Sequence, residues 1–376
     1  MKLCRLLLLI AIPISIVSCK NSVKNHVADK LSINLDSLER NFPFNSMFPF
    51  ERMVFLESSK DSKISDIHRI FDIDSLYVIW DKQNSSVYVH NKNGKYLNRI
   101  GAKGHAEHEY VNLDDVYINS KEKKVCMLDN ASHKILCFGY NGKYESTIKI
   151  KEWAIGFAIE EEFVWLESNG QNSASSLLLK TDVKSGDVIE SYFPMKNDGR
   201  IPIKSEKTFF TNSEGEILFS SPYLNTIYKI DNGNITPLVM LDFGLDALDD
   251  SDLTNESYIS KLQEGNYTGH IRNVYRCKDY MFISFLKYKN GTIENYYAIY
   301  NFTSKECYIY DDTLLHNPKL PIFPTADIIG VGTQNIVFSI DPSLLENDDL
   351  LKFPNIENLE TDLTQLNPIL IIYNVP

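Results

Sequence analysis

Apolar and polar positions repeat in the same order in two stretches of the chain that begin 48 residues apart, at residues 77–100 and 125–148. Asp81 in the first stretch corresponds to Asp129 in the second, and both stretches contain the turn sequence Asn-Gly-Lys-Tyr. Asn-Gly is a strong signal for a β-hairpin, because both residues tolerate positive φ. A period of about 40–50 residues with four short strands per unit is typical of the blades of a β-propeller.

Comparable units of short apolar runs and turns follow one another along the rest of the chain. Five units cover about residues 64–100, 112–150, 153–193, 208–243 and 271–310, and a sixth comprises residues 336–340 and 368–373. The last unit lacks an outer strand, whereas residues 52–56 form a strand that no unit claims. Pairing these residues with the last unit would close the ring and remove an exposed sheet edge. The pattern therefore predicts an all-β, six-bladed β-propeller in which an N-terminal strand closes the last blade.

Two polar and acidic segments, residues 246–265 and 341–366, do not fit the repeat. The first contains apolar residues at roughly helical spacing, namely Leu248, Leu253, Tyr258 and Leu262. A few such residues usually hold an insertion against the body of a protein. We expect short helices or loops that cover one rim of the propeller, and a lid or a partner contact is the alternative.

The first 18 residues have the pattern of an export signal. Lys2 and Arg5 precede an apolar stretch at residues 6–17. This stretch is too short to span a bilayer as a helix, which takes about 20 residues, and it fits a cleaved signal peptide. Residues 19–50 are polar without a sustained period and are expected to form a tether, which leaves residues 51–376 for the propeller domain.

Residues 16–19 resemble the lipobox of bacterial lipoproteins. The resemblance implies cleavage before Cys19 and a lipid anchor on that cysteine, whereas an ordinary signal peptide with an incidental cysteine is the alternative. Several acyl chains would hold firmly, since each buried CH₂ group contributes about 0.8 kcal/mol. Lys20 stands where lipoproteins retained in the inner membrane have aspartate. We therefore expect an outer-membrane anchor facing the periplasm, with the cell surface left open as an alternative.

The composition, with 43% hydrophobic and 23% charged residues, is that of a globular body. Without residues 1–18 the formal net charge moves from −12 to −14, because 36 basic residues then stand against 50 acidic ones. So acidic a chain repels nucleic acid phosphates, which excludes nucleic acid as a partner. We expect a monomer.

Four cysteines remain after the signal peptide and the lipidation site, namely Cys126, Cys137, Cys277 and Cys307. Cys126 and Cys137 belong to consecutive expected strands and could face each other across the hairpin. An oxidising compartment permits disulfides, but free cysteine also packs as a small hydrophobe, and we interpret the four residues as buried thiols. The absence of a CxxC motif or a Cys/His ligand spacing argues against a zinc site.

The segment from Arg99 to Tyr110 resembles the six-bladed β-propeller lipoproteins of Gram-negative bacteria, which are related to NHL-repeat proteins. Their first blade is followed by an isoleucine-glycine, a lysine-glycine and a glutamate-tyrosine pair, all present in this chain, whereas His105 and His108 replace the usual glycine and proline. Residues 219–228 and 367–373 resemble the same family. The resemblance implies the propeller fold and no particular reaction.

A cluster of side chains able to bind a ligand occurs in this connection, at His105, His108, Glu109 and Tyr110. Connections between blades carry function in propellers, so we take this as a candidate ligand loop. Two histidines three residues apart suit a metal site on a helix, but glycines make a loop the better interpretation, and no metal site is expected. The alternative is a polar loop whose end is packed by Tyr110.

No nucleophile elbow, Walker motif or dinucleotide-binding glycine loop occurs, so we expect no catalytic residue and no cofactor. The favoured function is that of a membrane-tethered, non-catalytic lipoprotein that binds a protein, peptide or glycan through one rim of the disc. The alternative is a periplasmic metal-dependent lyase or hydrolase that uses the central channel. Some NHL-type propellers are such lyases, although the eight histidines of this chain show no regular spacing between blades.

Overall fold

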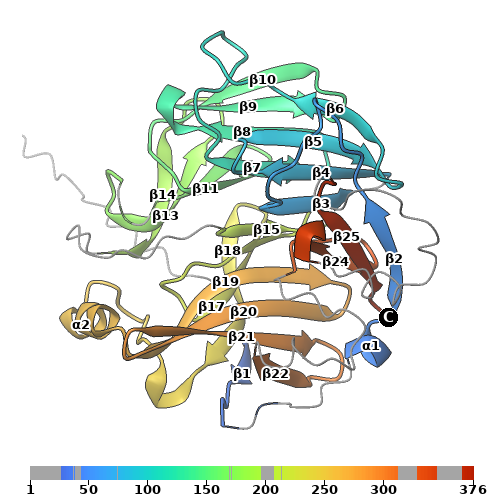
Figure 1. Cartoon of the computed structure of the whole chain (residues 1–376). Coiled ribbons are helices and arrows are strands. Elements are labelled where there is room, and N and C mark those ends of the chain that lie inside the picture. Colours follow the sequence, from blue (N-terminus) through green and yellow to red (C-terminus); the bar gives the residue numbers. More distant parts are fainter. Residues whose placement is uncertain are drawn as a thin grey trace, which may run out of the picture.

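The described part of the chain is a six-bladed β-propeller, as predicted (Figure 1). The computed structural model describes residues 27–36, 38, 44–73, 75–168, 170, 172–195, 207–212, 214–311, 328–344 and 366–376. Within these ranges the strands form six sheets, and the innermost strands of successive sheets contact one another around the centre.

The first three blades each consist of four consecutive antiparallel strands, of which the first lies nearest the centre and the fourth at the perimeter. Blade 1 contains β3 (Arg69–Ile73), β4 (Leu76–Asp81), β5 (Ser86–Asn91) and β6 (Tyr96–Ile100). Blade 2 contains β7 (Asp115–Asn119), β8 (Lys124–Asp129), β9 (Lys134–Gly139) and β10 (Tyr144–Lys149). Blade 3 contains β11 (Gly156–Glu160), β12 (Phe163–Glu167), β13 (Ser176–Asp182) and β14 (Val188–Pro194).

The other three blades follow the same plan with two additions from the N-terminal part of the chain. Blade 4 contains β15 (Phe209–Thr211), β16 (Ile217–Phe219), β17 (Thr226–Asp231), β18 (Asn234–Asp242) and, outermost, β1 (Asp29–Ser32). Blade 5 contains β19 (Tyr267–Cys277), β20 (Tyr280–Lys289), β21 (Thr292–Asn301) and β22 (Cys307–Asp311). Blade 6 contains β23 (Gly330–Val331), β24 (Asn335–Ile340), β25 (Ile369–Asn374) and β2 (Phe50–Phe55).

Closure of the ring by an N-terminal strand is confirmed. β2 pairs antiparallel with the last strand, β25, so that Arg52 lies opposite Ile372 and Phe55 lies opposite Ile369. The sheet of blade 6 therefore combines an N-terminal strand with the last strand of the chain, and this arrangement gives β25 a partner on each side.

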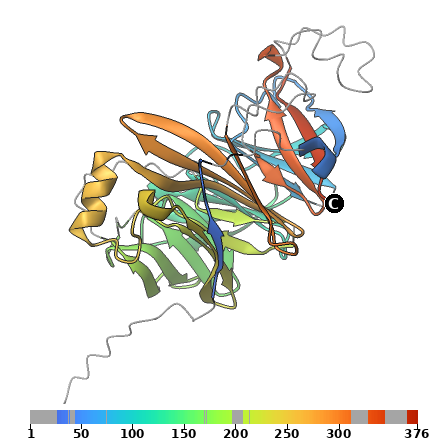
Figure 2. The same cartoon turned by 90° about the horizontal axis from the view of Figure 1, so that it is seen from below.

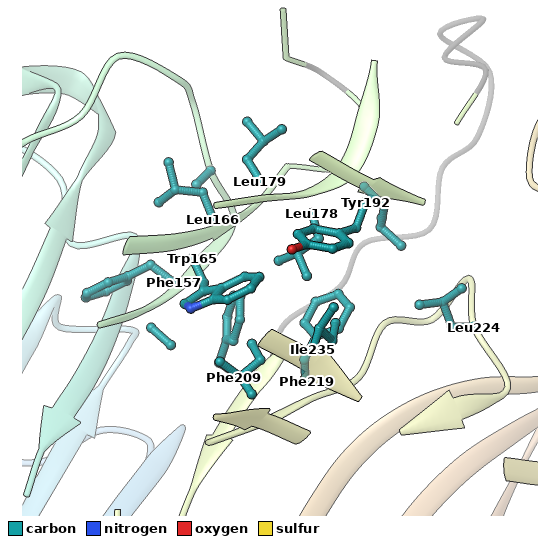
Figure 3. Packing of buried hydrophobic residues seen from close by; sticks show 14 of the residues in the cluster. Phe157, Trp165, Leu166, Leu178, Leu179, Tyr192, Phe209, Phe219, Leu224 and Ile235 are labelled. Atoms are coloured by element: carbon teal, nitrogen blue, oxygen red, sulfur yellow. The ribbon is translucent and has the colours of Figure 1, made fainter. Parts of the chain in front are cut away.

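The inner strands of a blade, such as β4, β5, β8 and β9, are buried almost throughout because neighbouring blades cover both of their faces. In Figure 3, Trp165 and Tyr192 of blade 3 face Phe209 and Phe219 of blade 4. The ring centroids of Trp165 and Tyr192 lie 5.7 Å apart, and those of Phe209 and Phe219 lie 5.3 Å apart. Burial of each such side chain stabilises the fold by about 1.5–3 kcal/mol relative to leaving it exposed. Repeated apolar runs in the sequence therefore predict blades that pack against one another.

The structure corrects the expected start of the folded body. Within the predicted tether, β1 pairs parallel with β18, and Leu31 lies opposite Leu241 in the core. The short helix α1 (Phe44–Met47) is part of the body too, since Phe44 is fully buried. In Figure 2 the two blue elements β1 and α1 lie against different blades. We call residues 27–36 and 44–49 the N-terminal strap.

The first predicted insertion contains a helix, as expected. Helix α2 (Glu256–Glu264) begins after Asn255, whose side chain accepts a hydrogen bond from the backbone N–H of Ser257. The apolar residues singled out from their spacing are all buried against blades 3 and 4, namely Leu248, Leu253, Tyr258 and Leu262. Of the second predicted insertion, most lies outside the described residues. Neither helix of the described part is long and apolar enough to cross a membrane.

Candidate functional site

The predicted ligand loop connects β6 of blade 1 to β7 of blade 2. His105 and His108 are exposed, and the imidazole of His108 stacks on the ring of Tyr144 with centroids 3.7 Å apart. Glu109 accepts a hydrogen bond from the backbone N–H of Ala106 at 2.9 Å. Tyr110 is fully buried and donates its hydroxyl to the carbonyl oxygen of Ser85 at 2.7 Å. The structure therefore places Tyr110 as the packed end of the loop, while the two imidazoles remain on the surface.

The two faces of the disc are built from different kinds of turn. The four strands that follow one another within a blade are antiparallel, so the turns between first and second strands lie on one face, which we call the inner-turn face. The connections from one blade to the next lie on the opposite face, which we call the connection face. The predicted ligand loop belongs to the connection face.

Side chains fill the middle of the central channel. Arg69 of β3 extends its guanidinium to 5.9 Å from the ring centroid of Phe210, and Tyr275 and Phe71 border the same space. The cavity left between them measures about 20 Å³, which is room for about one water molecule. The channel that the lyase alternative would use for catalysis is therefore occupied by side chains at this level.

The guanidinium of Arg69 lies 3.7 Å from the carboxylate of Asp115 on the neighbouring blade and donates to the carbonyl oxygen of Val116 at 3.2 Å. Burial raises the pKa of Asp115, and the nearby guanidinium opposes this rise. Asp115 also accepts a hydrogen bond from the backbone N–H of Phe157 on blade 3 at 3.1 Å. This buried pair therefore links three innermost strands, which is a structural role.

A larger cavity opens on the inner-turn face, where the first turns of blades 2, 3, 4 and 5 meet. It has a volume of about 420 Å³, and we call it the polar pocket. Six acidic and four basic side chains line it, namely Glu122, Glu160, Glu161, Glu214, Glu216, Asp231, Lys121, Lys229, Arg276 and Lys278. The pocket therefore offers both signs of charge to a ligand.

One part of the lining is held in place by a network around Glu216. Its carboxylate lies 2.7 Å from the guanidinium of Arg276 and 3.6 Å from the ammonium of Lys229. The Asn212 side chain accepts the backbone N–H groups of Glu214 and Glu216 at 3.1 and 2.9 Å, which fixes the turn that carries Glu216. A charge-assisted contact of this kind is stronger than a neutral hydrogen bond, so this wall is preorganised.

Other charged residues of the pocket face solvent. Lys121, Glu161 and Glu214 are exposed, and none of their side chains has an ion-pair partner within the described ranges. Each stands in a different turn, on blades 2, 3 and 4 respectively. These side chains are thus free to meet groups of a ligand.

Sequence reasoning missed the polar pocket because its residues come from four blades. Each turn carries only one to three charged residues, and a run of that kind is typical of any solvated turn. The Asn212-to-Glu216 spacing that fixes one wall was a readable signal, since asparagine commonly bonds to backbone groups two residues on. The convergence of the turns, however, depends on the order of the blades around the ring.

In the ranges that the structure describes, no group of three or more His, Cys, Asp or Glu side chains is placed to hold a metal ion. Cys19 and the signal sequence lie outside the described residues.

Comparisons with known proteins agree with the fold. A family model described as a domain of unknown function (DUF4934) matches residues 33–374. A crystal structure of an exported protein from Bacteroides fragilis NCTC 9343 matches with a TM-score of 0.69 and 18% identity, covering 93% of this chain and 100% of that chain. A member of the duf4221 family from Bacteroides vulgatus ATCC 8482 matches with a TM-score of 0.50 and 9% identity, covering 87% and 97%. At these identities the likeness concerns the fold alone. No curated protein matches the chain.

Proposed function

The chain belongs to the DUF4934 family, a domain of unknown function, and we propose that it is a membrane-tethered, non-catalytic propeller lipoprotein that binds a peptide segment of a partner protein in the polar pocket. The observation that carries this proposal is the polar pocket itself. Its volume of about 420 Å³ falls within the range of about 300–1,000 Å³ that is usual for ligand sites.

The chemistry of the pocket favours a peptide over a glycan. Sugars are commonly bound against exposed aromatic rings, whose faces are apolar. Tyr117 is the one aromatic residue among the described lining residues, and its hydroxyl is bonded to the carbonyl oxygen of Ile159 at 2.9 Å. Peptide side chains of both charges would instead pair with exposed groups such as Lys121 and Glu214. A glycan is the competing ligand class.

Two observations support export of the protein across the inner membrane. The relative from Bacteroides fragilis is described as an exported protein, and the first residues of this chain have the pattern of a signal peptide. A lipid on Cys19 would then tie the disc to the outer membrane, facing the periplasm or the cell surface. Nine residues separate Cys19 from β1, so an extended linker would reach roughly 30 Å from the bilayer.

The binding proposal is tested with the full chain on two arrays, one of synthetic peptides that contain both lysine and glutamate and one of bacterial glycans. The test variant combines Lys121→Glu with Glu214→Lys, which exchanges the two exposed charges and leaves the net charge unchanged. The matched control combines His105→Ala with His108→Ala on the connection face. We expect peptide binding by the native chain and by the control, and at least a tenfold weaker signal for the pocket variant.

Two outcomes would contradict the proposal. Binding lost in the histidine control and kept in the pocket variant would move the site to the connection face. Binding to glycans alone, reduced by the pocket variant, would keep the site and replace the ligand class. The anchor is tested separately by labelling cells with radioactive palmitate, where label that persists in Cys19→Ala would remove the proposed lipid attachment.

A further inference from the structure

Two cysteines face each other inside blade 2. Cys126 of β8 and Cys137 of β9 lie directly opposite in the antiparallel register, and their Sγ atoms are 2.8 Å apart. Directly opposed residues of an antiparallel pair have Cα atoms about 4.5 or 5.5 Å apart, and both distances fall within the usual range of about 4.4–6.8 Å for a disulfide. The backbone therefore needs no rearrangement to allow a bond between these sulfurs.

The surroundings of this pair differ from those of the other two cysteines. Both side chains are buried, at 1% and 2% exposure, in the apolar layer between blades 2 and 3. Cys277 and Cys307 belong to a different apolar layer, and the sulfur of Cys277 contacts the carbonyl oxygen of Gly332 at 3.6 Å. Cys126 and Cys137 are thus distinguished from the other two by their mutual contact.

We propose that Cys126 and Cys137 form an intramolecular disulfide that joins the second and third strands of blade 2. This inference rests on the proposed export, because a disulfide persists in an oxidising compartment. The oxidant is a disulfide, either of a protein oxidoreductase or of a small molecule such as oxidised glutathione.

The reaction follows thiol–disulfide exchange in two steps. The thiolate of Cys137 attacks the oxidant, forms a mixed disulfide with one of its sulfurs and releases the other as a thiol. The thiolate of Cys126 then attacks the Cys137 sulfur and releases the second thiol of the oxidant. Two protein thiols lose two electrons and two protons, and the oxidant becomes two thiols. The hydrogen bond from Cys126 lowers the pKa of Cys137, whereas burial raises the pKa of Cys126, so Cys137 is the better first nucleophile.

Burial determines when the bond forms. β8 and β9 are joined by a short turn at η1 (Asn130–Ser132), so their hairpin is a local structure. The oxidant reaches the two sulfurs before blade 3 covers them, or during a local opening of this layer. A bond formed in this way is protected afterwards, so reduction of the folded protein is expected to be slow.

The test uses the full chain, purified without reductant from the cell envelope, alkylated under denaturing conditions and digested with trypsin. Cleavage after Lys134 separates the two cysteines into peptides 125–134 and 135–143. We expect these peptides to be linked to each other and to separate on reduction. Cys277 and Cys307 serve as internal controls and should be alkylated.

A second arm separates this inference from the proposed export. The protein is reduced, refolded and exposed to oxidised glutathione, and Cys126→Ser and Cys137→Ser variants are treated in parallel. Formation of the linked peptides in the native chain and in neither variant supports the disulfide. If the protein purified from cells is nevertheless reduced, that finding argues against the proposed export and not against the disulfide. Failure of the native chain to form the link with oxidised glutathione, or links that involve Cys277 or Cys307 in equal amount, would overturn the inference.

Discussion

Asp29 accepts a hydrogen bond from the Lys305 ammonium at 2.8 Å, although the two residues are 276 positions apart in the chain. The hydroxyl of Tyr300 donates to the same carboxylate at 2.9 Å, and the Lys305 contact, the larger of the two effects, holds the pKa of Asp29 below its ordinary value. Asp29 opens β1, which is hydrogen-bonded to blade 4, whereas Lys305 and Tyr300 belong to blade 5. The N-terminal strap therefore bridges two blades.

The first prediction concerns this strap. Leu31→Ala removes a side chain that is 5% exposed and packs in the same core as blades 4 and 5. We expect the free energy of unfolding to fall by about 2 kcal/mol, at the lower end for buried leucine because the site is at the perimeter. Urea denaturation of the purified full chain measures this change.

Its control is Lys30→Ala in the same strand. The Lys30 ammonium lies 2.8 Å from the Asp242 carboxylate, but its side chain is 64% exposed, and such pairs contribute about 0–1 kcal/mol. Equal effects of the two substitutions would mean that β1 does not share in cooperative unfolding.

The sequence of β1 carries the pattern of a strand, although the strand was not predicted. In residues 29–34 apolar Leu31 and Ile33 alternate with polar residues, which is the pattern of a strand with one buried face. The run is short, and a single alternation of this length occurs in many polar linkers. The six longer units were predictable because strands covered on both faces must be apolar throughout. An edge strand carries about half of that signal.

A second prediction concerns the pH dependence of stability. His90 on β5 is fully buried, and neither ring nitrogen has a hydrogen-bond partner within the described part of the chain. Burial penalises the imidazolium and lowers the pKa of His90 to about 4. The folded state thus binds the proton less well than the unfolded state, whose histidine pKa is about 6.5. The stability associated with neutral His90 is present above pH 6.5 and is lost as the pH falls towards 4.

We expect His90→Gln to remove this part of the pH dependence. As the pH falls from 6.5 to 4, the free energy of unfolding of the variant should rise relative to that of the native chain by up to about 3 kcal/mol. Urea denaturation at several pH values gives the two curves, and the exposed His105→Gln provides the control. Parallel curves for the native chain and His90→Gln would show that His90 does not control acid sensitivity.

A third prediction uses the aspartates that first revealed the repeat. The carboxylate of Asp81 accepts the backbone N–H groups of Ser65 and Asn84, at 2.7 and 3.0 Å. That of Asp129 accepts those of Val111 and Asn112, at 2.9 and 3.3 Å. Each aspartate thus fixes the segment that leads into its own blade.

Replacing either residue by alanine leaves part-buried N–H groups without their carboxylate acceptor. We expect each alanine variant to lose roughly 2–3 kcal/mol of unfolding free energy, and each asparagine variant to lose less, because one side-chain oxygen remains. Thermal unfolding of the two alanine and two asparagine variants measures the order of their stabilities. An asparagine variant as unstable as its alanine counterpart would assign the effect to the charge rather than to the acceptor.

The candidate site was much less predictable than the fold. The segment from His105 to Tyr110 stood out because its ligand-capable side chains are adjacent in sequence. Lys121 and Glu214 are 93 positions apart and line the same pocket only because the turns of successive blades converge on the inner-turn face. A repeat pattern predicts that such turns exist, but it does not show which charges they bring together.

The last prediction compares three glycines with the same backbone conformation. Gly94, Gly142 and Gly291 all have a φ of +80°, which an L-residue adopts at a cost of about 1–2 kcal/mol. Their surroundings differ. A Cβ atom at Gly291 would meet nothing within 4 Å, one at Gly142 would lie 3.0 Å from the side-chain nitrogen of Asn98, and one at Gly94 would lie 2.1 Å from the carbonyl oxygen of Phe55.

Phe55 belongs to β2, the strand that closes the ring, and the next segment is held by a hydrogen bond from the Glu57 N–H to the Gly94 carbonyl oxygen at 2.8 Å. The backbone of Phe55 cannot move away from a Cβ atom at Gly94 without disturbing the pairing of β2 with β25. We therefore expect Gly291→Ala to lose about 1 kcal/mol of unfolding free energy, Gly142→Ala slightly more, and Gly94→Ala roughly 3 kcal/mol or more because strain and overpacking add. Urea denaturation of the three variants tests this order, and equal losses would mean that the contact between blade 1 and the closing strand does not stabilise the ring.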